Sequence, residues 1–337
     1  MLPLHFPLNF SFLPSHRGHF TPYFTKYVGK MPPAIWKKIE NSLENELVAI
    51  SVYATILPMK KRAALALDID GTITDERHLI PDEVAHYLKE LSQHFEIFLI
   101  TGRSFTFAES SITKLEFPYT LAVQHGADIL SMPDKKLLHR HYISAAMLSR
   151  LDTFFEREPE DYIIYAGYDR GDFCYYRPHM MSESLRAHCR ILERFSPTEW
   201  VSTRSYKTLD QGEFPLLKYF GKAEAMHHLQ AKMGKIDELH TCVIRDPLDT
   251  TLSLLLMTDK EADKGHALKR ILNHHNLDLP VIAAGDDNND RPMLEQADIA
   301  IVVETAPQAL HHVGDILAKP SKDLGIIPAL EEAIKRL

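Results

Sequence analysis

The sequence predicts an α/β protein: a Rossmann-like parallel sheet with a second, α+β domain inserted into it. Three observations carry this prediction. From residue 63 onward, short apolar runs alternate with stretches of helical spacing, as in successive β-α units. The alternation is interrupted between about residues 143 and 258 and then resumes. Acidic and glycine-containing motifs stand at the ends of apolar runs, where open α/β sheets bind ligands.

Length and composition narrow the class further. The 337 residues suffice for about two domains, and 45% hydrophobic with 25% charged residues is ordinary globular composition. Disorder of the whole chain and a fibrous repeat are therefore excluded. The formal net charge of −8 argues against a nucleic-acid partner, although a locally positive site for an anionic substrate remains compatible with it.

Cysteine usage and hydropathy indicate a cytoplasmic protein without a membrane partner. Cys174, Cys189 and Cys242 are scattered and form no C-x-x-C pair, so a disulfide scaffold or structural zinc site is not expected. No run of about 20 apolar residues is present to form a transmembrane helix.

Residues 1–60 differ from the rest and are interpreted as an N-terminal extension. The segment is rich in proline and has no acidic residue before Glu40. Three interpretations stay open: an upstream extension or mis-assigned start, a packed accessory segment, or an organelle-targeting sequence. The last is opposed by Arg17 being the only arginine before residue 39. The catalytic core is assigned to 61–142 and 259–337, and the inserted cap to 143–258.

The first part of the core begins with the continuous apolar run Ala63–Ile69, typical of a strand buried on both faces. Pro81 is suited to the first turn of the helix that follows. In order, the expected elements are a strand at 63–69, a helix at 81–94, a strand at 95–100, a helix at 104–115, a strand at 120–123 and a hairpin at 128–142.

The cap has its own mixture of elements. They are helices at 145–156, 182–195 and 222–233, strands at 162–168 and 215–220, and a hairpin of 241–245 with 251–258. Its aromatic residues either pack in a core or form a sugar-stacking surface; they are Tyr162, Tyr165, Tyr168, Phe173, Tyr175 and Tyr176.

The β-α pattern then returns and completes the core. The expected elements are helices at 264–274, from 292 and at 325–337, with strands at 280–284 and 299–303. A parallel sheet interrupted by an inserted domain accounts for this order.

The most specific motif is Asp68-Ile69-Asp70-Gly71-Thr72, at the end of the first buried strand. Two acids in a buried crevice repel each other, and a hard cation with oxygen ligands or a shared proton relieves the repulsion. The simpler alternative is a strand followed by a turn, because Asp, Gly and Thr all favour turns.

Two further motifs offer groups that bind anions. Thr101-Gly102-Arg103 ends the second strand, where a hydroxyl and a backbone amide suit a phosphate, or alternatively a plain helix cap. Lys264 opens the helix that follows the cap. A lysine there opposes the helix dipole and favours a nearby anion, unless it is merely solvated.

The last motif is Gly285-Asp286-Asp287-Asn288-Asn289-Asp290, after the strand at 280–284. Its acids and amides suit a metal with oxygen ligands, and a surface turn is the alternative. The four motifs in this order are far more specific than any one of them.

In these motifs the chain resembles the haloacid dehalogenase-like hydrolase superfamily. It is most similar to the Cof-type group with the large (type IIB, C2B) α/β cap, which also includes phosphomannomutase-like proteins. The resemblance covers about residues 63–337 and rests on DIDGT, LITGR, the lysine of DKGHAL, and GDDNND. It implies a phosphatase acting on a small phosphate ester.

The resemblance also implies roles for single residues. Asp68 would be the nucleophile that forms an aspartyl-phosphate, and Asp70 the acid that protonates the leaving alcohol. Thr101 and Lys264 would hold the phosphoryl oxygens. Gly71, Thr72, Gly102 and Asn289 would help to bind the phosphate. Mg²⁺ would be held by Asp68, Asp70 and Asp286, with Asp290 in support.

Arg103 is a weaker candidate, either contacting the leaving group or forming a surface salt bridge. The sequence departs from the family at His125, where relatives usually have asparagine, and at Val303-Glu304-Thr305-Ala306. These departures leave the substrate open, with a sugar phosphate expected. The alternatives are an intramolecular phosphomutase and a non-catalytic binding protein, and the oligomeric state is not predicted.

Overall fold

The computed structural model describes residues 61–209, 212–246 and 248–337. Contacts divide the chain into residues 1–59 and residues 60–337, and the following concerns the second unit. The predictions made for the N-terminal extension lie outside the described residues. Across those residues, no helix combines the length and apolar character that crossing a membrane requires.

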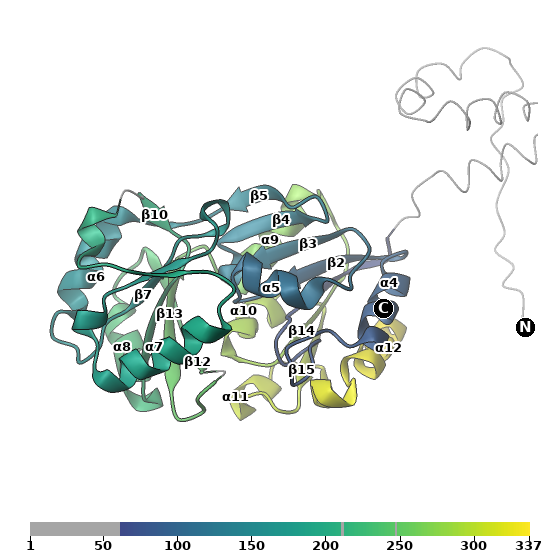
Figure 1. The fold of residues 1–337 in the computed structure, drawn as a ribbon. Coiled ribbons are helices and arrows are strands. Elements are labelled where there is room, and N and C mark those ends of the chain that lie inside the picture. Colours follow the sequence, from purple (N-terminus) through teal and green to yellow (C-terminus); the bar gives the residue numbers. More distant parts are fainter. Residues whose placement is uncertain (1–60, 210–211, 247) are drawn as a thin grey trace, which may run out of the picture. The chain divides into compact units, whose positions relative to one another are not determined.

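The larger sheet has eight strands in the order β16-β15-β14-β1-β2-β3-β4-β5 (Figure 1). Strands β16 to β3 are parallel to one another, and β4 and β5 add an antiparallel edge. The bounds are β1 (Ala63–Leu67), β2 (Phe95–Ile100), β3 (Tyr119–Val123), β4 (Asp128–Met132), β5 (Lys136–Arg140), β14 (Val281–Gly285), β15 (Ile299–Val303) and β16 (Ile316–Ala318).

Helices cover both faces of this sheet, which explains why its central strand is apolar throughout. One face packs against α4 (Asp82–Leu91), α5 (Phe105–Ile112) and α12 (Ile326–Arg336). The other packs against α9 (Lys264–His274), α10 (Arg291–Leu294) and α11 (Gln308–His311). Within β1, alternate residues enter the two cores: Leu65 faces the first and Ala66 the second.

A second sheet of six strands, in the order β12-β13-β11-β7-β8-β9, is built from the segment between β5 and α9. We refer to residues 143–258 as the insert. Its strands are β7 (Ile163–Tyr165), β8 (Cys174–Tyr176), β9 (Trp200–Ser202), β11 (Leu217–Gly221), β12 (Leu239–Arg245) and β13 (Ser253–Asp259). A small separate pair consists of β6 (Ile143–Ser144) and β10 (Glu213–Phe214).

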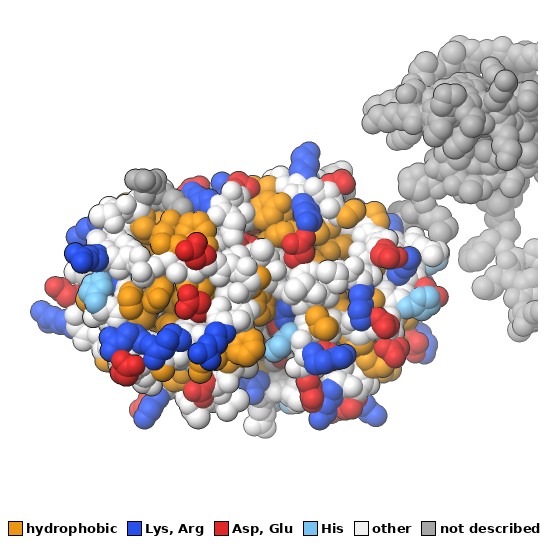
Figure 2. All heavy atoms as spheres, in the orientation of Figure 1, with side chains coloured by type: hydrophobic (Ala, Val, Ile, Leu, Met, Phe, Trp, Pro, Cys, Tyr) orange, Lys and Arg blue, Asp and Glu red, His pale blue; other side chains and the backbone are white. Residues whose placement is uncertain are grey.

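Three helices cover the insert's sheet. Helices α6 (Ala145–Phe155) and α8 (Ala223–Met233) share a core with one face, and α7 (Glu183–Phe195) packs on the other. Figure 2 shows a row of basic side chains where α7 lies in Figure 1, and the sequence of α7 repeats arginine at 186, 190 and 194. Glu183 pairs with the first two arginines, as on the solvated face of an amphipathic helix.

The insert contacts the loops of the larger sheet at several places, among them the short 3₁₀ helix η5 (Asn288–Asp290) and the beginning of α5. Strand β12 packs against η5. The Asp172 carboxylate accepts hydrogen bonds from both the backbone N–H and the hydroxyl of Thr106, each at 2.8 Å. Asp172 thereby caps the beginning of α5, whose own N-cap residue Ser104 makes no side-chain cap bond.

The predicted fold class is confirmed, and the differences concern short elements. The strand expected over 162–168 ends at Tyr165, and a 3₁₀ turn follows at Tyr168–Arg170. Strands β8, β9 and β16 and helix α11 were not expected, because three or four residues are too few for periodicity to show. The insert's aromatic residues mostly pack into its two cores, as for Tyr162.

Candidate active site

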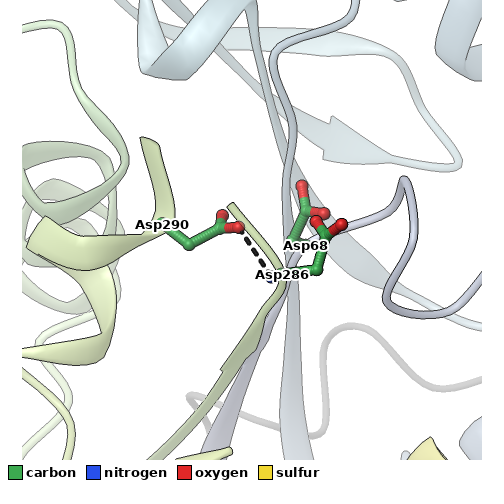
Figure 3. Close-up of side chains that lie close together, drawn as sticks. All are labelled: Asp68, Asp286 and Asp290. Carbon is green, nitrogen blue, oxygen red and sulfur yellow. Dashed lines mark hydrogen bonds between the residues drawn. The ribbon is translucent and has the colours of Figure 1, made fainter. Parts of the chain in front are cut away.

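Two of the acidic motifs meet at the carboxyl edge of the larger sheet. Strands β1 and β14 are parallel neighbours, with Leu67 opposite Ala284, so Asp68 and the loop from Gly285 leave the sheet together. Carboxylate oxygens of Asp68, Asp286 and Asp290 lie within 4.8 Å of one another. In Figure 3 the side chains of Asp68 and Asp286 lie side by side, and that of Asp290 approaches from α10's side.

Lys264 supplies the cation in this cluster. Its ammonium donates to one carboxylate oxygen of Asp68 and to one of Asp290, and its side chain is only 1% exposed. Burial alone would lower the pKa of Lys264, but the two carboxylates outweigh it and raise that pKa. The lysine is therefore a permanent positive charge, and the carboxylates offset its unfavourable place at the start of α9.

Asp68 has one oxygen on Lys264, and the other accepts a hydrogen bond of 3.3 Å from the hydroxyl of Thr72. Burial raises the pKa of the Asp68 carboxyl to about 7, although Lys264 acts in the opposite direction. Asp68 thus presents a carboxyl group at a location from which water is largely excluded, since it is 3% exposed.

Asp290 binds Lys264 with one carboxylate oxygen and holds the loop after β14 with the other. Its second oxygen accepts hydrogen bonds from the backbone N–H groups of Asp286 (2.9 Å) and Asp287 (3.0 Å). Asp287 in turn caps η5. The carboxylate of Asp290 is fully buried and therefore acts by holding other groups in place.

Asp286 faces Gly71. A Cβ atom at Gly71 would lie 2.3 Å from an oxygen of Asp286, and Gly71 has a φ of +70°, so only glycine fits. Burial and the charges of Asp68 and Asp290 raise the pKa of the Asp286 carboxyl well above its usual range. Three carboxylates around one ammonium leave negative charge uncompensated.

That excess of buried negative charge fits a hard divalent cation. All the available donors are carboxylate oxygens, the ligands that Mg²⁺ prefers, and burial together with the neighbouring carboxylates raises the pKa of two of the three carboxyls. Asp68 and Asp286 are the side chains placed to hold such an ion. Asp290 is near enough to support it while it remains on Lys264.

Asp70 turns away from this cluster toward Arg103. The guanidinium donates through Nε (2.6 Å) and through Nη2 to the two carboxylate oxygens, and His78 Nδ1 lies 3.2 Å from one of them. Burial opposes ionisation, but the bonds from His78 and Arg103 outweigh it and hold the pKa of Asp70 well below its usual range. Asp70 is therefore an ionised partner of Arg103 in this arrangement.

Arg103 is not the exposed arginine that one interpretation of the sequence expected. It is 8% exposed, and its remaining nitrogen donates to the hydroxyl of Ser111, which donates to the carbonyl of His78. The partnership of Arg103 with Asp70, His78 and Ser111 escaped the sequence analysis. Eight to thirty-three residues separate these partners in the chain, and no spacing rule links them.

Thr101, Gly102, His125 and Asn289 form the other side of the site. The buried Thr101 hydroxyl accepts from the backbone N–H of Arg103 at 3.1 Å. The imidazole of His125 lies against Gly102, where a Cβ would be 2.6 Å from Cε1, and its Nδ1 is 3.5 Å from the Asn289 amide. The structure thus brings together all four motifs that the sequence marked.

His125 is a buried residue of the site with an unusual backbone conformation. It adopts a φ of 61° and is 5% exposed. Burial, reinforced by the positive charges of Lys264 and Lys218, lowers the pKa of His125 well below its usual value. It is therefore a neutral imidazole between two candidate phosphate-binding residues. In the sequence, His125 stands out only as a departure from relatives.

The fold and this acidic edge define an α/β enzyme that has an inserted domain, a buried aspartate, a lysine and a candidate cation site. A family model described as haloacid dehalogenase-like hydrolase matches residues 65–330. The chain belongs to the haloacid dehalogenase-like hydrolase family and is an enzyme of that family.

Individual relatives agree with this assignment. The chain is 22% identical over 283 residues to "Phosphatase YwpJ" of Bacillus subtilis, covering 78% of this chain and 96% of that protein. It is 23% identical over 281 residues to a "Phosphoglycolate phosphatase" of Methanobrevibacter smithii, covering 80% and 98%.

Solved structures resemble it over a similar extent. A haloacid dehalogenase-like hydrolase from B. subtilis has a TM-score of 0.66 at 19% identity, covering 80% of this chain and 99% of that one. A sugar phosphatase of subclass IIB has a TM-score of 0.61 at 18% identity, covering 80% and 98%. These similarities support the fold.

Proposed function

We propose that the protein is a Mg²⁺-dependent phosphatase that hydrolyses a small phosphorylated metabolite, with a sugar phosphate as the expected class. The observation that carries the proposal is the pairing of buried Asp68 with Lys264, beside Asp286 and uncompensated negative charge. Relatives that bear the name phosphatase, and a sugar phosphatase of similar fold, support it.

In the first step, a carboxylate oxygen of Asp68 attacks phosphorus and the bond from phosphorus to the ester oxygen breaks. The electron pair leaves with the alcohol, which takes a proton from Asp70, and Asp68 carries the phosphoryl group. Lys264, the Thr72 and Thr101 hydroxyls and the Gly102 backbone would hold the phosphoryl oxygens, with Asn289 beside them. A bound Mg²⁺ would reduce the repulsion between carboxylate and phosphate.

In the second step, water attacks phosphorus and the bond to Asp68 breaks, which releases inorganic phosphate. Asp70, now deprotonated, accepts the proton of the attacking water. The proposal requires Asp70 to exchange its bonds to Arg103 for a place beside the ester oxygen. A carboxyl whose pKa is held low by an arginine is a poor proton donor.

The insert would select the substrate and cover the reacting groups. Strand β12 packs on η5, which contains Asn289 and Asp290. The insert's sheet is therefore already close to the catalytic edge. The assignment of residues 143–258 as a cap domain, a place in the Cof-type group and a cytoplasmic location belong to the same proposal.

The test is phosphate release from sugar phosphates and p-nitrophenyl phosphate, with Mg²⁺ present or chelated. We expect release that needs Mg²⁺ and is abolished in Asp68→Asn. Asp237→Asn, at an exposed aspartate of the insert, is the matched control. Free phosphate also separates a phosphatase from a phosphomutase, which returns the group to its substrate. A well-folded protein that releases no phosphate from any ester contradicts the proposal.

A further inference from the structure

One side chain of the insert stands out because it is a cation within an apolar surface. Lys218 lies in the middle of β11, between Leu217 and the buried Tyr219. Its ammonium is 4.7 Å from the centroid of the Tyr165 ring on β7. Its side chain is only partly buried. An aromatic face attracts a cation but does not neutralise it.

The strand register places Lys218 on the face of the insert's sheet that also packs against α7, in a row that runs across the sheet to β12. Lys218 is opposite Leu256 on β13, and Leu256 is opposite Cys242 on β12. Registered partners in a sheet project from the same face, so these three residues form a row across it. The row ends on β12, which packs against η5.

Electrostatic effects agree with this placement. The charge of Lys218 contributes to lowering the pKa of His125, the imidazole that lies against Gly102. The charges of Asp290 and Lys264 likewise act on the thiol of Cys242. Lys218 and Cys242 are therefore both near enough to the catalytic edge of the larger sheet for its charges to matter.

Lys218 has no carboxylate of its own among the described residues. Within residues 61–209, 212–246 and 248–337 its ammonium forms neither an ion pair nor a hydrogen bond. The two acids whose charges act on it are committed elsewhere, Asp70 to Arg103 and Asp246 to His188. Burial therefore lowers the pKa of Lys218, because the charges of these acids do not outweigh it. A desolvated cation without a counterion is costly.

We infer that Lys218 binds a second anionic group of the substrate, at the end remote from the transferred phosphoryl group. This inference rests on the proposed phosphatase function and narrows its substrate class to esters that carry a carboxylate or a second phosphate. The phosphoryl group is held by the larger sheet's edge through Lys264, and the remote anion completes the ion pair that Lys218 lacks. Lys218 is then a specificity-determining residue.

The test compares kcat/KM for two pairs of esters that differ mainly in one anionic group. The first pair is 3-phosphoglycerate and glycerol 3-phosphate, and the second is glucose 1,6-bisphosphate and glucose 6-phosphate. We expect the wild-type enzyme to prefer the more anionic member of at least one pair. In Lys218→Met we expect that preference to fall about 10- to 100-fold, as for a lost hydrogen bond between charged groups.

Two further variants separate specificity from folding. Lys218→Arg keeps the cation and should retain most of the preference. Lys235→Met removes an exposed lysine of the insert and should leave the preference unchanged. Lys218→Met should unfold at a temperature no lower than wild type, because it removes an unpaired charge and keeps an apolar stem of similar length.

A second readout does not depend on turnover. In the Asp68→Asn background, calorimetry should show weaker binding of the preferred anionic ester when Lys218→Met is added. If wild type hydrolyses p-nitrophenyl phosphate but has no preference within either pair, or if Lys218→Met keeps the preference, the inference is overturned and the phosphatase stands. If no ester at all is hydrolysed, the proposed function fails and the inference fails with it.

Discussion

Arg103 holds both carboxylate oxygens of Asp70 and is itself almost completely buried. The fork of a guanidinium matches a carboxylate at two points, which a lysine ammonium cannot do. The pair joins the loop after β1 to the start of α5, and it fixes where Asp70 points before substrate arrives.

Arg103→Lys should therefore destabilise the protein although it conserves the charge. We expect the free energy of unfolding to fall by about 1–2 kcal/mol, a moderate figure because the Asp70 side chain is 42% exposed. Urea unfolding measures it. Arg150→Lys is the matched control, since Arg150 and Glu238 are both exposed and their pair should contribute under about 0.5 kcal/mol. Equal effects of the two substitutions would show that burial of Arg103 does not matter.

Asp70→Asn should affect esters according to their leaving groups. An alkyl alcohol needs a proton as it departs, so we expect turnover of sugar phosphates to fall by about 10²- to 10⁴-fold. p-Nitrophenolate departs without one, so the first step with p-nitrophenyl phosphate should survive. Stopped-flow measurement should then show a burst of one equivalent of p-nitrophenol followed by slow turnover. Absence of a burst, with equal losses on both esters, would remove Asp70 from the proton-donor role.

Mg²⁺ should stabilise the folded protein through Asp286. Binding at 100 times the dissociation constant contributes about 2.7 kcal/mol, which thermal unfolding detects readily. In Asp286→Asn this response should be lost. The metal-free variant should nevertheless be at least as stable as metal-free wild type, because the raised pKa of Asp286 marks it as an unfavourable buried charge. Asp237→Asn should respond to Mg²⁺ like wild type.

The thiols should react slowly while the protein is folded. Burial raises the pKa of Cys189 and of Cys242 to about 12, and raises that of Cys174 as well. At pH 8 only about one thiol in ten thousand would then be ionised, and the thiolate is the reactive form. Ellman's reagent should therefore label the native protein slowly at pH 8, faster as the pH rises, and label three thiols at once in urea. Rapid labelling of the native protein would contradict the burial.

Much of the core could be predicted because its signals are local. The continuous apolar run before Asp68 and the similar runs before Thr101 and Gly285 predicted buried parallel strands, and parallel strands end at one edge. That geometry brings three of the motifs together, and the beginning of α9 adds Lys264 to them. The three-residue strands of the insert could not be predicted in this way, since they contain too few residues for a period to appear.

Partnerships between distant side chains were the part that the sequence did not predict. Asp70 pairs with Arg103 because of how two loops cross, and Lys218 interrupts an apolar strand without any local sign of what faces it. Asp172, whose carboxylate caps α5 from the insert, is a similar case, because it lies 66 positions after its partner Thr106 in the chain. Such contacts depend on tertiary geometry and not on spacing.

The order of strands in the larger sheet has a consequence for how the chain is made. Strand β1 lies between β2 and β14, and Ala64 pairs with Val281, which is synthesised only after the whole insert. During that interval one edge of a wholly apolar strand has no partner, and such edges readily pair with other chains. Completion of the sheet is thus a late, long-range event in biosynthesis, and until then the free edge of β1 is a place at which newly made chains can associate.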